Sequence, residues 1–200
     1  MKVNYIDMGL WVGAEITAMK NTIFPALKID DYRIYGFEAA KENFVKLPKY
    51  NDDRIRVFHK AIGNVNGKIK LYHCNKGNKG HSIYKTKRNV SEENFEEVDC
   101  VILSDWIKEN VPDFEETFNI LRMNIEGAEW EVFKSLEDAD MIKYVNVFAG
   151  SHGNDVDKVR ELSSTAYRDL IERNKIERHM FRGKEKEFAG FIEVLRRHLT

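Results

Sequence analysis

The stretch "RMNIEGAEWEVF", residues 122–133, predicts a strand that ends at a glycine and continues as an amphipathic helix. The predicted helix runs on to about Leu136 and places four apolar residues on one face: Ala128, Val132, Phe133 and Leu136. Three polar residues surround the change from strand to helix: Asn124, Glu126 and Glu129. Because open α/β sheets bind ligands at the carboxyl ends of their strands, we expect a ligand beside this turn.

Apolar runs of strand length alternate with helical patterns along the rest of the chain, which is typical of a parallel sheet wrapped by helices. Five strands are expected, at 3–7, 33–38, 55–61, 118–124 and 144–149. Helices are expected at about 12–24, 40–47, 127–136 and 155–173, and a short helix with Ser104 as its N-cap should follow "VDCVIL". The segments 175–182 and 188–197 would add an antiparallel pair at the sheet edge.

These elements predict an α/β fold with a central, mostly parallel seven-stranded sheet and helices on both faces. The length of 200 residues suits a single domain spanning 1–200. Segment 74–97 is polar and too long for a routine connection of about four to six residues. It is a candidate lid or substrate loop, or plain surface.

Composition narrows the class of protein further. The hydrophobic fraction of 42% and the charged fraction of 32% are those of a soluble globular protein, and a net charge of −1 gives no general attraction to nucleic acid. The two cysteines, Cys74 and Cys100, are too few for a disulfide framework and are not spaced as a metal site. No run approaches the ~18 apolar residues of a membrane span and no signal region is apparent. We expect a cytoplasmic protein.

The first strand ends in "YIDMGLWVGAE", which contains the pattern D-x-G-x-x-x-G with Asp7, Gly9 and Gly13. Glycines at a strand-to-helix turn let the backbone approach a ligand closely, although a turn that needs positive φ and binds nothing explains them equally well. This pattern differs from the dinucleotide fingerprint G-x-G-x-x-G.

Glu38 ends the second predicted strand, where an acid can accept hydrogen bonds from a ribose diol. Alone, it is better explained as a solvated acid or as the N-terminal acid of the next helix. Because Asp7, Gly9, Gly13 and Glu38 fall in the right order on consecutive strands, together they favour a nucleoside ligand.

With these motifs the chain resembles the FkbM family of S-adenosylmethionine-dependent methyltransferases. The Rossmann-like class I fold of that family matches the predicted fold. Six segments carry the resemblance over about residues 3–152: "IDMGLWVGAE", "YGFEAAKENFVKL", "VFHKAIGNVNGKIKLY", "GHSIY", "VILSDWI" and "RMNIEGAE". The last resembles the family's K-x-D-x-E-G-x-E block, with Arg122 in place of lysine and Asn124 in place of aspartate. Leu10 and Trp11 replace the small and polar residues that usually follow the first glycine.

The resemblance implies a role for each cofactor-site residue. The backbone at Gly9 and Gly13 would hold the amino-acid end of S-adenosylmethionine, with Asp7 near its ammonium or organising the turn. Glu38 would bind the ribose hydroxyls. The remaining cofactor candidates are Ala61 and Ile62, which would flank the adenine, and Ser82, which matches a serine in the family's loop.

Transfer of a methyl group to a hydroxyl needs an oriented nucleophile and a destination for its proton. The candidates are Glu126, Glu129 and His152, with His81 a weaker one; Asn124 can orient a hydroxyl but cannot act as a base. Each has another explanation, because an acid such as Glu129 is favoured in a first helical turn and His152 can be a surface residue. No metal ligand set is predicted, although a metal-assisted variant stays open.

We predict an O-methyltransferase acting on a sugar or another small molecule. A nucleic-acid methyltransferase is the nearest rival, because "NKGNKGHSIYKTKRN" is basic and carries Tyr84. It loses support because Asn124 is followed by "IEG" and not by two prolines and an aromatic residue. A second rival is a module that binds S-adenosylmethionine without turnover.

Overall fold

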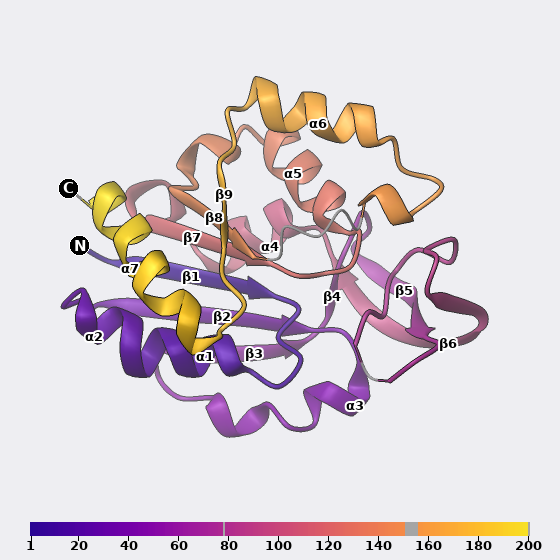
Figure 1. Cartoon of the computed structure of the whole chain (residues 1–200), viewed down its shortest axis with the longest axis horizontal. Coiled ribbons are helices and arrows are strands. Elements are labelled where there is room, and N and C mark those ends of the chain that lie inside the picture. Colours follow the sequence, from indigo (N-terminus) through magenta and orange to yellow (C-terminus); the bar gives the residue numbers. More distant parts are fainter. Residues whose placement is uncertain (78, 151–155, 200) are drawn as a thin grey trace.

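The computed structural model describes residues 1–77, 79–150 and 156–199. Within them, six strands form one sheet in the order β3-β2-β1-β7-β8-β9, and neighbouring strands pair in parallel throughout (Figure 1). The strands are β1 (Val3–Met8), β2 (Tyr32–Glu38), β3 (Ile55–His59), β7 (Phe118–Met123), β8 (Val147–Gly150) and β9 (Arg178–Met180). The order reverses between β1 and β7, which is where open α/β sheets bind ligands.

The central strands are buried on both faces, as expected for a parallel sheet covered by helices. Every residue of β1 and of β7 is buried. Because side chains alternate along a strand, Tyr5 packs into one apolar core and its neighbour Ile6 into another. One core lies under the helices near the two chain ends, and the other lies under helices between residues 103 and 173.

Helices cover both faces of the sheet. The first face carries α1 (Ala14–Ala18), which continues through a π-helical turn (Met19–Ile23) into α2 (Phe24–Ala26), and α7 (Glu185–Leu199). The second face carries α4 (Leu103–Asn110), α5 (Glu129–Asp138) and α6 (Ser164–Arg173). Short helices are α3 (Lys41–Phe44) and four 3₁₀ turns, Pro48–Tyr50, Phe114–Glu116, Ile142–Tyr144 and Val156–Lys158.

Three further strands form a small second sheet in the order β4-β6-β5. They are β4 (Ala61–Ile62), β5 (Gly67–Cys74) and β6 (Val90–Val101), with β6 parallel to β4 and antiparallel to β5. The predicted loop 74–97 is therefore shorter than expected, since its last eight residues belong to β6. The remaining connection, 75–89, is called the β5–β6 segment below.

The α/β fold class, with a mostly parallel sheet and helices on both faces, is confirmed, but the predicted C-terminal pair of antiparallel strands is wrong. Within the described residues the central sheet has six strands rather than seven, because 188–197 lies in α7 and β9 pairs parallel to β8. Phe188, Phe191 and Leu195 recur at helical spacing, and the last two are buried against the first core.

Two helix starts also differ from expectation. Ile102, not Ser104, is the N-cap of α4, and its N–H donates to Asn66 Oδ1 at 2.8 Å. The helix expected over 155–173 begins only at α6, where the Ser163 side chain accepts a hydrogen bond from Ala166 N. Across the described ranges, every helix is too short or too polar to span a bilayer.

Candidate functional site

A cavity of about 420 Å³ lies at the carboxyl ends of the central strands. Gly9, Glu38 and Asn124, which follow or end β1, β2 and β7, all line it. Ala61 and Ile62 line the cavity from β4, and Ser82 lines it from the β5–β6 segment. The structure thus brings these six predicted residues to one cavity, and the predicted Glu126 and His81 line it as well.

The glycine turn after β1 depends on Gly9. Its φ is +90°, and a Cβ there would lie 2.2 Å from the carbonyl oxygen of Asn124. Its N–H donates to Phe37 O at 2.9 Å, which ties the turn to β2. Gly13 also has a positive φ, +79°, but it is covered by the Tyr50 ring and does not line the cavity.

Glu38 is held by backbone donors at the tip of β2. Its Oε2 accepts from Trp11 N at 2.7 Å and its Oε1 accepts from Ala40 N at 2.9 Å. Burial raises the pKa of Glu38, against the opposing effect of these hydrogen bonds. The Asn43 side chain is also hydrogen-bonded to this carboxylate. Two carboxylate oxygens offer about four acceptor sites, so the group can still accept a bond from a ligand hydroxyl.

Arg122 lies fully buried between two acids. Nη1 donates to Asp7 Oδ1 at 3.0 Å and to Gly9 O at 2.9 Å, and Nη2 donates to Glu15 Oε1 at 2.5 Å. A planar guanidinium can make these bonds in several directions, whereas a lysine ammonium would match fewer of them. Arg122, at the position where the resemblance implies a lysine, thus binds two acids, Asp7 and Glu15.

Asp7 is fully buried and does not line the cavity. Its side chain is therefore not placed to contact the ammonium of a ligand in the cavity. Its Oδ2 accepts from Tyr5 Oη at 3.0 Å, so Asp7 organises the turn together with Arg122. Burial raises the pKa of Asp7, partly offset by Arg122. Burial likewise raises the pKa of Glu15 to about 7, and Glu15 does line the cavity.

Glu126 also lines the cavity, beyond the tip of β7, and adopts a positive φ of +59°. Its Oε2 accepts from Lys87 Nζ at 2.6 Å, and its backbone oxygen accepts from Ser82 Oγ at 2.9 Å. The Lys87 side chain is only 1% exposed, and its ammonium also donates to Asn89 Oδ1 at 2.7 Å. The β5–β6 segment is thereby bonded to the turn that carries Glu126.

The other predicted catalytic residues differ in placement. Asn124 lines the cavity, and its N–H donates to Met8 O at 2.9 Å. Glu129 does not line it; its carboxylate accepts from the N–H groups of Ile125 and Gly127 and so closes the turn. His152 lies outside the described residues.

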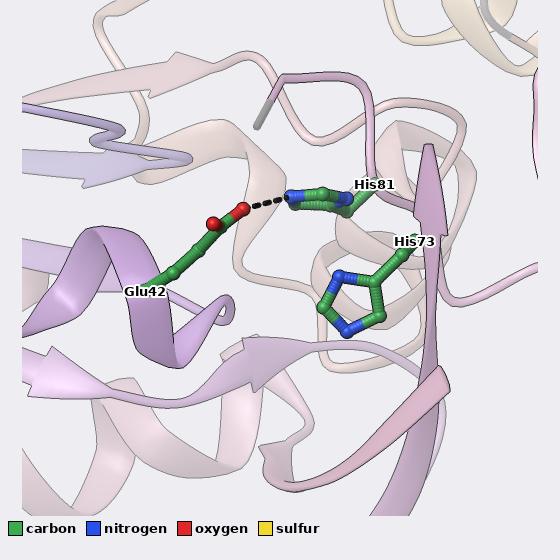
Figure 2. Close-up of side chains that lie close together, drawn as sticks. All are labelled: Glu42, His73 and His81. Atoms are coloured by element: carbon green, nitrogen blue, oxygen red, sulfur yellow. Dashed lines mark hydrogen bonds and ion pairs between the residues drawn. The ribbon is translucent and has the colours of Figure 1, made fainter. Parts of the chain in front are cut away.

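His81 belongs to a cluster with Glu42 and His73, whose ligand atoms lie within 4.8 Å of one another (Figure 2). Its Nδ1 accepts from Cys74 N at 2.9 Å, so the ring proton is on Nε2, which faces Glu42 Oε1 at 3.1 Å. Burial lowers the pKa of His81. A metal would need the lone pair of Nε2, and ligating histidines normally donate from their other nitrogen. We therefore interpret the cluster as a hydrogen-bonded contact between α3 and the β5–β6 segment.

The sequence interpretation missed several residues of the site. Glu15 and Lys87 were not singled out, and neither was the loop 182–184, which lines the cavity from the C-terminal part of the chain. Trp11 lines the cavity beneath Lys79, whose Nζ lies 3.5 Å from the indole centroid. For Glu15 a signal existed, because it directly follows the glycine turn, whereas Lys87 and the loop lie far from their partners in sequence.

The parallel sheet, the glycine turn after β1 and the acid at the tip of β2 define a Rossmann-like α/β protein with its cavity at the strand ends. The chain belongs to the FkbM methyltransferase family, since the family described as the Methyltransferase FkbM domain matches residues 12–198.

A search of solved structures found the crystal structure of methyltransferase FkbM from Methylobacillus flagellatus KT, at 14% sequence identity and a TM-score of 0.41. The alignment covers 98% of this chain and 36% of that one, so this chain spans about a third of the length of that protein. No curated protein matches the chain.

Proposed function

We propose that this chain is a single methyltransferase domain that uses S-adenosylmethionine as its methyl donor. The observation that carries the proposal is the lining of one cavity by Gly9, Glu38, Ala61 and Ile62, in a chain of a methyltransferase family. Glu38 would accept hydrogen bonds from the ribose hydroxyls, and Ala61 and Ile62 would offer apolar surface to the adenine.

We further propose O-methylation of a hydroxyl on a sugar or another small molecule. In such a reaction the acceptor oxygen attacks the sulfonium methyl, S-adenosylhomocysteine leaves, and the hydroxyl proton passes to a base or to water. Asn124 and Glu126 both line the cavity from the turn after β7 and can orient the hydroxyl. The Glu126 carboxylate can take the proton through the oxygen that Lys87 does not bind.

Isothermal titration with S-adenosylmethionine and S-adenosylhomocysteine tests the cofactor. Replacing Glu38 with Ala should weaken binding by roughly 1 to 3 kcal/mol through lost hydrogen bonds. The exposed Glu93, which does not line the cavity, supplies the control, because Glu93→Ala should leave affinity unchanged. Equal affinity of Glu38→Ala and the parent protein would place the nucleoside elsewhere.

A panel of hydroxyl acceptors with labelled cofactor then tests the reaction. Methyl transfer to a sugar or small-molecule hydroxyl supports the proposal, and transfer that survives exhaustive chelation argues against a metal-assisted variant. The second candidate function is a cofactor-binding module without turnover, favoured by Asn124 in place of the family's aspartate. Tight cofactor binding with no transfer to any acceptor would support that alternative.

A further inference from the structure

The loop between β9 and α7 approaches the glycine-turn side of the cavity. Arg182, Gly183 and Lys184 all line it, although they lie near the C-terminus and the turn lies near the N-terminus. Gly183 has a φ of +68°, and a Cβ there would lie 3.0 Å from Glu15 N. The chain passes from β9 to α7 beside α1 (Figure 1). This loop therefore packs directly on the first turn of α1.

Two contacts hold this loop in place. Phe181, which precedes it, is fully buried and stacks on Phe191 of α7 with ring centroids 4.3 Å apart. Its backbone oxygen accepts from Arg122 Nε at 3.4 Å. The buried guanidinium that binds Glu15 thus also binds the segment that carries Lys184.

Of the two basic side chains in this loop, one has an ion-pair partner among the described residues and the other has none. Arg182 donates through Nε and Nη2 to Glu187 Oε1, so its charge is already matched. Lys184 forms no ion pair within the described part of the chain. Glu15 is 7% exposed, and Arg122 binds one of its two oxygens. One carboxylate and one unmatched ammonium therefore line the same end of the cavity.

We propose that Glu15 and Lys184 form a dipolar subsite that binds the ammonium and the carboxylate of an α-amino-acid group. This inference rests on the proposed function and deepens it, since the amino-acid group would be the methionyl end of S-adenosylmethionine. The C-terminal loop then completes the cofactor site. Glu15 takes the ammonium contact expected for Asp7, which Arg122 and Tyr5 enclose away from the cavity.

The surroundings of Glu15 support this assignment. Arg122 from β7, Asp7 from β1 and Glu187 from α7 are the charged groups whose fields act on its carboxyl. Burial raises its pKa to about 7, so near neutral pH the ionised and protonated forms are both populated. A ligand ammonium placed in the cavity would favour the ionised form.

The test compares ligands with and without the amino-acid group. Isothermal titration is run with S-adenosylmethionine and with 5′-methylthioadenosine, which keeps the nucleoside and lacks the amino-acid end. Lys184→Ala should weaken S-adenosylmethionine binding about 5- to 30-fold and leave 5′-methylthioadenosine binding within about twofold. Glu15→Gln should show the same selectivity. Lys186→Ala, which changes an exposed lysine two positions further along that does not line the cavity, is the matched control.

The outcomes separate this inference from the proposed function. If the parent protein binds both ligands and Lys184→Ala weakens both equally or neither, the dipolar subsite is wrong while the cofactor proposal stands. If the parent protein binds neither ligand, both proposals fail. Because Lys184 is exposed, its replacement should not perturb folding, and the unchanged affinity for 5′-methylthioadenosine verifies that directly.

Discussion

The stability of Glu15→Gln relative to the parent protein should rise as pH rises through neutrality. Glu15 is a buried carboxyl whose pKa is raised to about 7 from an ordinary value of 4.5, first by burial. Below pH 4.5 the group is protonated in both the folded and the unfolded chain. Between pH 4.5 and 7 the unfolded chain releases its proton while the folded chain keeps it, so stability falls as pH rises.

The magnitude follows from the size of that shift. A difference of about 2.5 pH units corresponds to about 3 kcal/mol, at about 1.4 kcal/mol for each unit. Glutamine does not titrate, and its amide oxygen can still accept from Arg122. The free energy of unfolding of Glu15→Gln minus that of the parent should therefore rise by about 3 kcal/mol between pH 4.5 and 8.

Urea unfolding followed by circular dichroism at pH 5, 6, 7 and 8 measures this difference. Glu137→Gln supplies a contrast, because hydrogen bonds from Arg173 lower the pKa of Glu137 to about 2. The stabilisation that goes with this lowered pKa is present above pH 4.5 and is lost only as pH falls towards 2. The difference in free energy of unfolding between Glu137→Gln and the parent should therefore be constant from pH 6 to 8. A Glu15→Gln difference that is flat or falls with pH would refute the reasoning.

Three further substitutions have defined expectations in the same unfolding assay. Lys87→Met leaves Glu126 without its buried partner and should cost about 2 to 4 kcal/mol, whereas Lys85→Met, at an exposed ion pair, should stay within about 0.5 kcal/mol. Arg122→Lys should cost about 2 kcal/mol, because an ammonium cannot reproduce the guanidinium's bonds to two acids. Gly9→Ala should cost about 3 kcal/mol or more, since a methyl carbon 2.2 Å from a carbonyl oxygen forces the turn apart. A cost below 1 kcal/mol in any of these three would contradict its stated cause.

The central strands were predictable because burial on both faces requires continuous apolar runs, and such runs are visible in the sequence. The C-terminal segment was not assigned correctly. Its stretch "FAGFIEVLRR" is short and apolar enough for a strand, yet Phe188, Phe191 and Leu195 also have helical spacing. The segment is a helix because its apolar side chains pack on the face of the sheet that carries α1. This contact joins opposite ends of the chain, so it cannot be seen in the local sequence.

Some residues of the site could likewise be predicted from the sequence, and others could not. Gly9, Glu38 and Asn124 could be predicted because the tip of each parallel strand lies at one edge of the sheet, so sequence position alone places them. Asp7 lies near the same edge of the sheet, but its side chain does not line the cavity and binds Arg122 instead. Lys87 could not be predicted, because its partner Glu126 is 39 positions away and only the folded β5–β6 segment brings them together.

The stretch that begins at Arg122 connects two separate walls of the cavity. Arg122 binds Glu15 and the backbone of Phe181, so it holds the C-terminal loop on the side proposed for the cofactor's amino-acid end. Four residues further on, Glu126 binds Lys87 and so holds the β5–β6 segment on the side proposed for the acceptor. Each wall depends on its own buried cation. Losing Lys87 should therefore impair methyl transfer with little effect on cofactor affinity, whereas changing Arg122 should weaken cofactor binding first.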